Sequence, residues 1–374
     1  MKIAVNTRFL LRDKLEGIGW FTYEVLNRLV KLRPDDEFVF IFDRPFDEQF
    51  VTAENVKGVT TFPPARHPFL WYCWFEWAIP GQIHASNADL FISPDGFCSL
   101  NVTVPTLMVT HDIAHHHFPE QVPTLARWYY NRFIPRFLKK ADHIITVSDF
   151  TKKDIEEVYG IPAAKMTVAH NGSRNIFRPL PEDDQRAVRD RFSNGKPYFF
   201  YYGAVHPRKN VHRLISAFDQ FKKNNSADVK LLIGGRFAWQ TGPVKTAYEK
   251  AAFKKDIHFL GYLSENDLTA LTASALAMAY ISNFEGFGLP ILEAMHSEVP
   301  VITSNVSSLP EVAGEAALFV NPSSVKQIES ALFQLWDQPD LRKELIEKGK
   351  HQRTQFYWDK TASIINETID RLMF

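Results

Sequence analysis

The stretch from residue 276 to residue 314 places an apolar run, a glycine loop and a helix start in immediate succession. The apolar run 276–281 predicts a buried strand. The loop 285–288 (EGFG) has two glycines, where the backbone must turn tightly or approach something closely. Pro290 suits a first helical position, because its missing N–H has no intrahelical partner there. A glycine loop before a helix N-terminus presents N–H groups and a positive dipole end, which suits an anion such as diphosphate.

Two carboxylates frame this loop. Glu285 lies within it, and Glu293 follows eight residues later, where the pattern predicts the first turn of the helix. With about 100° per residue, Ile291, Leu292 and Met295 form a buried stripe, and Glu293 points away from it into a cleft or solvent. The spacing alone fits a plain glycine turn equally well, with Glu293 favoured only by the helix dipole.

Short apolar strands alternate with helical segments along the whole chain, and the pattern restarts near residue 198. The expected strands are 2–6, 38–42, 90–92, 104–109 and 144–147, then 198–202, 229–233, 257–260, 276–281, 299–303 and 317–320. This alternation predicts an α/β fold of two doubly wound, Rossmann-like sheets. Prolines and charges cluster at 177–197, so we expect an N-terminal domain at 1–180, a second domain at 181–354 and a final segment at 355–374.

Length and composition limit the class of protein. A chain of 374 residues fits two domains, and 45% hydrophobic with 23% charged residues is typical of a globular protein. The formal net charge of zero gives no support for a nucleic-acid partner. Cys73 and Cys98 make neither a disulfide scaffold nor a metal-ligand spacing. With no signal-peptide core or bilayer-spanning run, a cytoplasmic location is expected.

The segment 203–210 (GAVHPRKN) closes a strand and opens a helix. Arg208 and Lys209 are two cations at a helix N-terminus, where they oppose the macrodipole unless an anion is present. A solvated basic turn is the alternative. His111 ends another apolar strand, at the sheet edge where such folds hold their sites, although a lone histidine is often structural.

Two possible motifs are rejected. Gly17 and Gly19 invite comparison with a dinucleotide fingerprint, but Thr22 stands where the third glycine would be. The consecutive histidines 115–117 cannot converge on one tetrahedral ion without a distorted loop, so we expect no metal there.

Two aromatic stretches remain, at 69–77 and at 127–140. The first is dense enough to stack on sugars or to line a lipid-facing groove. The second carries five basic residues, no acidic one and interleaved aromatics, so it could lie on an anionic bilayer surface. Core packing explains the aromatics equally well, and Pro135 is expected to interrupt the helix.

The strings EGFGLPILEAM, VPVITSN and SLPEVAG resemble the E-x7-E region of the retaining glycosyltransferases of family 4. The resemblance covers nearly the whole chain, most strongly residues 198–322. It implies the GT-B fold, in which two Rossmann-like domains face a central cleft, a C-terminal helix that crosses back to the N-terminal domain, and a nucleoside diphosphate sugar as donor. It also implies a cytoplasmic enzyme, with contact at the inner face of the membrane as a further alternative.

The resemblance also implies roles for particular residues. The catalytic group is Glu285, His111, Arg208 and Lys209, and the donor-binding group is Gly19, Gly203, Gly261, Gly286, Phe287, Gly288, Leu289 and Glu293. The family's commoner arginine directly after the glycine is replaced by Ala204, so Arg208 must act from a different backbone position. No Asp-x-Asp motif is present, and basic side chains and helix dipoles must neutralise the diphosphate. No metal or other cofactor is therefore expected.

The sequence thus predicts a retaining glycosyltransferase that moves a hexose from a nucleoside diphosphate sugar to a saccharide or lipid-linked saccharide. The variant 208–210 and the SLPEVAG ending resemble mannosyltransferase-like members of polysaccharide pathways, which makes GDP-mannose the working choice of donor. Two alternatives stay open. One is a nucleotide-sugar epimerase on the same fold, and the other is a non-catalytic sugar-nucleotide-binding protein.

Overall fold

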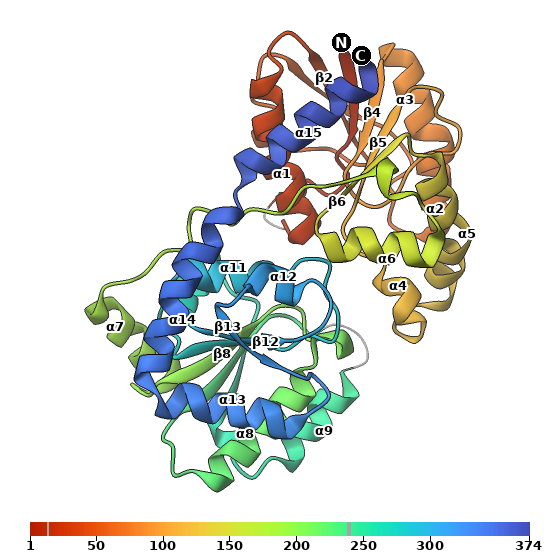
Figure 1. The fold of residues 1–374 in the computed structure, drawn as a ribbon. Helices are drawn as coiled ribbons and strands as arrows, with labels where there is room; N and C mark the ends of the chain where they lie inside the picture. Colours follow the sequence, from red (N-terminus) through yellow and green to blue (C-terminus); the bar gives the residue numbers. More distant parts are fainter. Residues whose placement is uncertain (13–14, 238–240) are drawn as a thin grey trace. The chain divides into compact units, whose positions relative to one another are not determined.

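The chain divides into two compact units in a computed structural model that describes residues 1–12, 15–237 and 241–374 (Figure 1). Unit 1 holds Met1–Asn171 and Tyr357–Phe374, and unit 2 holds Gly172–Phe356. The division after Asn171 comes earlier than the expected boundary at residue 180. The reason is local, because Arg174 already bonds to Glu293 of unit 2.

Unit 1 contains, among its described residues, a seven-stranded parallel sheet in the order β3-β2-β1-β4-β5-β6-β7. Its strands are β1 (Lys2–Asn6), β2 (Glu37–Phe42), β3 (Val56–Thr60), β4 (Leu90–Ser93), β5 (Thr106–Thr110), β6 (His143–Thr146) and β7 (Met166–Val168). Its helices are α1 (Gly17–Leu32), α2 (Pro68–Cys73), a π-helical turn (Trp74–Ala78), α3 (Ile79–Ser86), α4 (Ala114–His117), α5 (Thr124–Lys140), α6 (Asp149–Tyr159) and α15 (Trp358–Met373). The strand order reverses between β1 and β4.

Unit 2 contains, within the described chain, a six-stranded parallel sheet in the order β10-β9-β8-β11-β12-β13. Its strands are β8 (Tyr198–Tyr202), β9 (Lys230–Gly234), β10 (Ile257–Gly261), β11 (Ala277–Tyr280), β12 (Val301–Ser304) and β13 (Ala317–Val320). Its helices are α7 (Glu182–Ser193), α8 (Val211–Asn224), α9 (Gly242–Lys250), α10 (Glu265–Ala273), α11 (Leu289–His296), α12 (Leu309–Ala313), α13 (Val325–Asp337) and α14 (Pro339–Gln352). Here the order reverses between β8 and β11, and that point is where ligands bind in such sheets.

The last helix, α15, packs on α1 within unit 1 (Figure 1). α1 buries Phe21, Val25 and Leu29 at helical spacing, which is the pattern of an amphipathic helix on a sheet. The ring of Trp358 meets Phe21 edge-on at 6.0 Å. Arg33 donates to Asp370 at 2.7 Å. Apolar and charged contacts together therefore fix the chain end to the first helix.

The helix α5 runs through Pro135 without a break, so the expected interruption is wrong. An internal proline removes one helical hydrogen bond and costs about 3 kcal/mol. The neighbouring side chains offset that cost, because Phe133, Ile134, Phe137 and Leu138 are all buried in the core of unit 1. No helix in the described ranges is both long and apolar enough to cross a bilayer.

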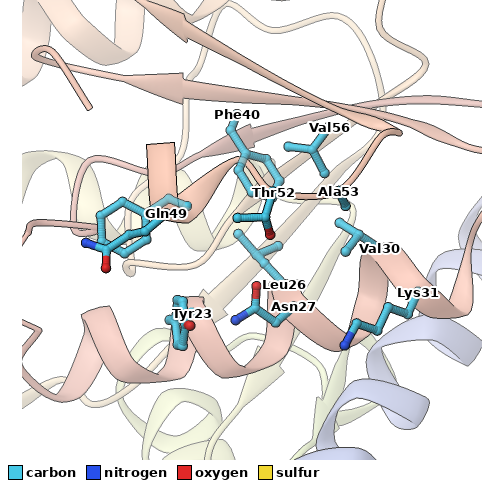
Figure 2. Close-up of a pocket in the computed structure, with 11 residues that line it drawn as sticks. Tyr23, Leu26, Asn27, Val30, Lys31, Phe40, Gln49, Thr52, Ala53 and Val56 are labelled. Carbon is cyan, nitrogen blue, oxygen red and sulfur yellow. The ribbon is translucent and has the colours of Figure 1, made fainter. Parts of the chain in front are cut away.

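A cavity of about 250 Å³ lies between α1 and the β2–β3 edge of unit 1 (Figure 2). Leu26 and Val30 of α1 and Phe40 of β2 form its apolar base, and Asn27 and Gln49 are among its polar lining residues. None of the residues assigned to the site from the sequence lines this cavity.

Candidate active site

The cation of Lys209 and the carboxylate of Glu285 meet where the strand order of unit 2 reverses. Lys209 follows β8 and Glu285 follows β11, and these strands pair directly in the sheet. Lys209 Nζ lies 2.5 Å from Glu285 Oε1. Tyr280, the last residue of β11, donates its hydroxyl to the same oxygen at 2.8 Å and accepts from Lys209 Nζ at 2.8 Å. The three groups form a closed triangle at the carboxyl edge of the sheet.

Glu285 is held as a carboxylate. Burial by itself raises its pKa, but the charges of Lys209 and Arg208 outweigh burial and bring the pKa to about 2. Arg208 Nη1 lies 3.5 Å from Glu285 Oε2 and donates to the carbonyl of Phe284 at 2.8 Å. Both cations expected from the sequence therefore reach the same loop, and Arg208 does so from its own backbone position rather than that of Ala204.

Two serines of the β12–α12 loop hold the backbone on either side of Glu285. Ser307 Oγ accepts from the Glu285 N–H at 3.1 Å. Ser308 Oγ lies 2.9 Å from the Glu285 carbonyl oxygen and 2.8 Å from that of Phe287. The loop that carries Glu285 is thus fixed from outside by side chains as well as by its glycines.

Gly288 is the N-cap of α11 and needs to be glycine for two reasons. Its φ of 112° lies in the left-handed region, and a Cβ there would come within 2.8 Å of Leu309. Leu289 then begins the helix, with Gly286 and Phe287 before it in the loop. The ring of Phe287 packs edge-on against Phe356 at 5.6 Å, so the group that Phe287 can offer a donor is its backbone.

Gly203 follows β8 and Gly261 ends β10, and these two strands flank β9, which Gly235 follows. Gly235 N–H donates to the Gly261 carbonyl at 2.6 Å. A Cβ on Gly235 would lie 1.9 Å from the Gly203 carbonyl oxygen, so the backbones of the β8 and β9 ends can come this close only without a side chain. The structure thus brings both predicted glycines to one edge, and it adds Gly235.

Glu293 lies beyond the first turn of α11 and is not open to solvent, which corrects the expected placement. Its residue is 4% exposed. Arg174 covers it, since Nε and Nη2 both donate to Glu293 Oε1, at 3.1 and 3.0 Å. Burial raises the pKa of Glu293 to about 7, although Arg174 opposes the rise. Glu293 therefore titrates near neutrality, whereas Glu285 remains ionised.

His111 follows β5 in unit 1, half-buried beside α1. Its Nε2 lies 2.8 Å from the Pro94 carbonyl oxygen, so Nε2 carries the proton and Nδ1 is the basic nitrogen of the neutral ring. The ring of Phe21 meets it edge-on at 4.9 Å. Burial lowers the pKa of His111, which keeps it neutral.

Gly19 lies inside the first turn of α1. A Cβ at this position would come within 2.9 Å of the Phe9 carbonyl oxygen. The absence of a side chain at Gly19 is therefore explained by the packing of the chain's own backbone, and its role towards a donor stays a prediction.

The strand-order reversal in unit 1 also holds an ion pair, which the sequence did not indicate. Arg8 follows β1 and Asp95 follows β4, and Arg8 Nε lies 2.5 Å from Asp95 Oδ2. Asn6 donates to the same oxygen at 2.8 Å. The guanidinium is enclosed by Phe9, Phe75 and Phe97, with 4.6 to 5.0 Å from its carbon to their ring centres.

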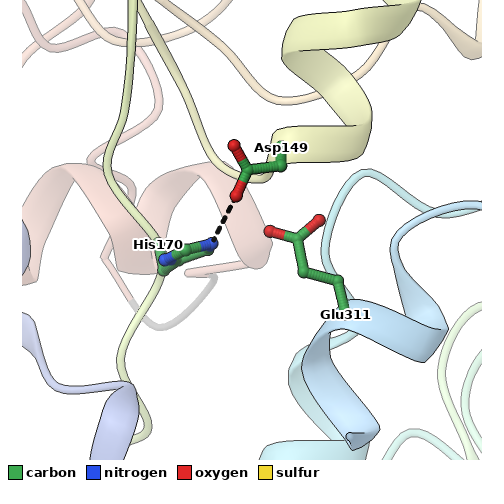
Figure 3. A group of neighbouring side chains, drawn as sticks. All are labelled: Asp149, His170 and Glu311. Carbon is green, nitrogen blue, oxygen red and sulfur yellow. Dashed lines mark ion pairs between the residues drawn. The ribbon is translucent and has the colours of Figure 1, made fainter.

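The histidines that follow β5 are used in separate contacts within unit 1. His115 Nε2 lies 3.1 Å from the Tyr159 hydroxyl, and His117 Nε2 lies 2.8 Å from Asp154 Oδ1. Further along, His170 Nε2 lies 4.0 Å from Asp149 Oδ2 at the start of α6 (Figure 3). The His170 carbonyl accepts from Thr361 of α15.

Two family models match the chain, one over each unit. Residues 15–173 match the model described as Glycosyltransferase Family 4, and residues 183–352 match the model described as Glycosyl transferases group 1. The chain belongs to the glycosyltransferases. Its solved relatives share the fold of two parallel-sheet, Rossmann-like domains, and the enzyme uses a sugar donor.

Two curated relatives are bacterial. This glycosyltransferase is 28% identical over 382 aligned positions to O-antigen chain mannosyltransferase B of Escherichia coli, with 98% of this chain and 99% of the relative covered. It is 29% identical over 297 aligned positions to O-antigen chain mannosyltransferase RfbU of Salmonella typhimurium, with 78% and 77% covered.

Two solved structures have the same fold at low identity. The sucrose-phosphate synthase of Thermosynechococcus elongatus superposes with a TM-score of 0.79 at 17% identity, covering 99% of this chain and 98% of that one. HepE of Anabaena, solved in complex with UDP and glucose, gives a TM-score of 0.75 at 18% identity, covering 99% and 100%.

Proposed function

We propose that this glycosyltransferase is a retaining hexosyltransferase that works without a metal ion. It takes a hexose, with mannose as the working choice, from a nucleoside diphosphate sugar and passes it to a saccharide or lipid-linked saccharide. The arrangement of Lys209, Arg208 and Glu285 at the strand-order reversal of unit 2 carries the proposal. The names of the curated relatives, both mannosyltransferases of O-antigen assembly, support the choice of sugar and pathway.

The proposed reaction breaks the bond between the sugar's C1 and the diphosphate oxygen and forms a bond from C1 to an acceptor hydroxyl oxygen. The acceptor's proton passes to the departing phosphate oxygen, on the same face, so the anomeric configuration is kept. Negative charge grows on the diphosphate as C1 becomes oxocarbenium-like. Lys209 and Arg208 can stabilise that charge, together with the amides of residues 286–289 at the N-terminus of α11.

The two glutamates take different parts in this proposal. Glu285 is ionised, with its pKa held at about 2, and a carboxylate can accept hydrogen bonds from the hydroxyls of the donor sugar and orient C1. Glu293, paired with Arg174, would hold the ribose of the donor. The pKa of His111 is lowered by burial, and its role beside the transferred sugar stays a proposal that rests on the family resemblance.

Two cations on one carboxylate also support metal independence. A Lys209–Arg208 pair provides positive charge where a metal-dependent enzyme would place an ion held by Asp-x-Asp, and that motif does not occur in the sequence. The test is turnover after treatment with EDTA. Undiminished activity is expected. Loss with EDTA and recovery with Mg²⁺ would overturn this part of the proposal.

The function itself is tested by incubating the protein with GDP-mannose, UDP-glucose and UDP-galactose, each with and without a lipid-linked saccharide acceptor. The expected result is release of nucleoside diphosphate that depends on acceptor and gives a product with the donor's anomeric configuration. An epimerase would release nucleoside diphosphate or an altered sugar without acceptor. A non-catalytic binding protein would change neither substrate.

A further part of the proposal is contact with an anionic membrane through one face of unit 1. Trp77 of the π-helical turn is 63% exposed and Trp128 of α5 is 60% exposed. Tyr72 joins them, since its ring centre lies 5.8 Å from that of Trp77 and 5.7 Å from that of Phe133, which in turn lies 6.2 Å from Trp128. Arg136 lies over the ring of Phe133 at 5.8 Å. We call the four exposed residues of this group, Tyr72, Trp77, Trp128 and Arg136, the aromatic–basic face, and the buried Phe133 lies beneath it.

The sequence left two roles open for the aromatic residues of α5, core packing and contact with a bilayer, and these residues differ in burial. Tyr129, Phe133 and Phe137 are buried and belong to the core, whereas Trp128 is exposed. Exposed tryptophans beside basic residues are suited to the headgroup region of an anionic bilayer. The aromatic–basic face would bring the enzyme to a lipid-linked acceptor.

A further inference from the structure

Arg174 joins two carboxylates of unit 2 through one guanidinium. Its Nε and Nη2 donate to Glu293 Oε1 on α11, and its Nη1 donates to Glu265 Oε1 at 2.9 Å, at the start of α10. The guanidinium carbon lies 4.9 Å from the ring centre of Phe177. Three neighbours therefore fix the plane and position of this guanidinium, although the residue lies in a segment without helix or strand.

The two hydrogen bonds from Arg174 reach only one of the two carboxylate oxygens of Glu293. Both donors of Arg174 reach the same oxygen, Oε1, and Oε2 accepts no hydrogen bond from the part of the chain that the structure describes. A carboxylate oxygen has lone pairs for more than one donor. Arg174 therefore fixes the orientation of Glu293 and leaves Oε2 able to accept hydrogen bonds from a ligand's hydroxyls.

We propose that Arg174 is a positioning residue for donor binding, which fixes Glu293 so that Oε2 receives the ribose hydroxyls of the nucleoside diphosphate. The inference rests on the proposed function, in which Glu293 holds the ribose. It adds a residue outside the E-x7-E segment on which that binding depends, and it gives Glu265 the role of holding Arg174 from the solvent side.

The charge balance around Glu293 supports this role. Burial raises the pKa of Glu293 and Arg174 is the charged group that lowers it, so loss of Arg174 favours the protonated acid at neutral pH. Arg174 lies between Glu265 and Glu293 and donates to both. Lys350 and Arg353 pair with Glu298, and His296, whose pKa is lowered to about 4 by burial and by Arg353, is neutral near pH 7.

The chain offers a matched control for substitutions at Arg174. Arg191 of α7 also donates to an acidic residue of α10, reaching Asp267 Oδ1 at 2.8 Å, and it makes no contact with Glu293. Arg191→Ala thus removes an arginine–α10 ion pair without touching the proposed ribose contact. Arg174→Lys keeps the charge but loses the planar, two-donor contact.

The experiment first measures the affinity of wild type for GDP and for UDP by calorimetry. The nucleotide that wild type binds more tightly is then used for all variants. For each variant, the affinity for this nucleotide is compared with the affinity for its 2′,3′-dideoxy form. Wild type is expected to bind the ribose form about 10-fold more tightly, as the loss of one or two charge-assisted hydrogen bonds predicts. Arg174→Ala and Glu293→Gln should each reduce this ratio to about 2-fold or less. Arg174→Lys should restore part of it, and Arg191→Ala should leave it unchanged.

The pH dependence gives a second readout that a packing role would not change. Affinity of wild type for the ribose form should rise between pH 6 and pH 8, and in Arg174→Ala the rise should move to higher pH. If Arg174→Ala does not fold, the Arg174→Lys ratio and profile decide, and wild-type values in that variant overturn the proposal. A full ribose preference in a folded Arg174→Ala overturns it as well.

Failure of the proposed function has a different outcome. If wild type binds neither GDP nor UDP, the nucleotide-sugar assignment itself is wrong. If wild type binds the ribose and dideoxy forms equally, the ribose role of Glu293 is wrong, and the Arg174 proposal is overturned with it.

Discussion

The Nζ atom of Lys209 lies 2.5 Å from Oε1 of Glu285, although the two residues belong to different strand–helix units of the chain. They meet because β8 and β11 are neighbours where the sheet order reverses. A buried carboxylate with two nearby cations is a preorganised, fixed distribution of charge, and such distributions act strongly on charge that develops in a transition state.

Glu285→Gln should lower kcat by roughly 100-fold or more, because the variant keeps the shape but loses the charge that orients the donor sugar. Affinity for the bare nucleoside diphosphate should stay near that of wild type. Steady-state kinetics together with calorimetry separate the two quantities. Normal turnover with weakened nucleotide binding would mean that the roles of Glu285 and Glu293 are exchanged.

Lys209→Ala should reduce kcat/KM by about 100-fold or more, since a charge-assisted contact to the departing phosphate is lost. The same substitution leaves Glu285 buried without its main cation, so the double variant Lys209→Ala/Glu285→Gln should be less impaired than the sum of the two single effects. Additive losses in this cycle would contradict a coupled pair.

Arg208→Ala should lower kcat/KM by a factor comparable to that of Lys209→Ala if Arg208 has taken over the role of the arginine that Ala204 replaces. Its distance of 3.5 Å from Glu285 Oε2 places it on the same loop as Lys209. Rates equal to wild type in single-turnover measurements would assign Arg208 to holding the Phe284 carbonyl instead.

Stability should fall as pH rises from 4.5 towards 7, because the folded chain holds the proton of Glu293, whose pKa is raised to about 7, more tightly than the unfolded chain does. The effect is on the order of 3 kcal/mol. Glu285 acts oppositely at lower pH, where its contribution is present above 4.5 and is lost towards about 2. Thermal unfolding at pH 5 and pH 8 should therefore differ less in Glu293→Gln than in wild type, and an unchanged difference would contradict the assignment.

The aromatic–basic face predicts salt-sensitive binding to vesicles that contain anionic lipid, as each basic residue near such a surface adds about 1 kcal/mol. Trp77→Ala and Trp128→Ala should each weaken co-sedimentation several-fold. Tyr262→Ala, which removes an aromatic residue of unit 2 that is 71% exposed, is the control. Equal, negligible sedimentation with neutral and anionic vesicles would leave this face without a membrane role.

Much of the fold could be predicted because most strands and helices follow from patterns within a short stretch of sequence. The strands that bury both faces, such as β8 and β11, are continuous apolar runs. The edge strands β3 and β7 were missed, since an edge strand needs fewer apolar residues, and β3 has no fully buried residue. The continuation of α5 through Pro135 depends on tertiary packing and could not be predicted from the local cost of proline.

The candidate site was predictable where one segment carries it and not where distant segments meet. Glu285, Lys209 and Gly288 lie in strand–loop–helix units that sequence spacing indicates. Arg174 pairs with Glu293 across 119 positions, and Arg8 pairs with Asp95 across 87 positions. No periodicity in the sequence links such partners. The burial of Glu293 and its raised pKa could therefore not be predicted from the sequence.

The position of α15 makes unit 2 an insertion within unit 1, because Tyr357–Phe374 completes the unit that Met1 begins. A ribosome that synthesises this chain releases the whole of unit 2 before the helix that covers α1. Unit 2 can therefore fold while the apolar face of α1 that receives Trp358 still lacks this cover. Completion of unit 1 is in this way delayed until α15 has been synthesised, so a substitution that weakens α15 would affect a unit whose first strands were made long before it.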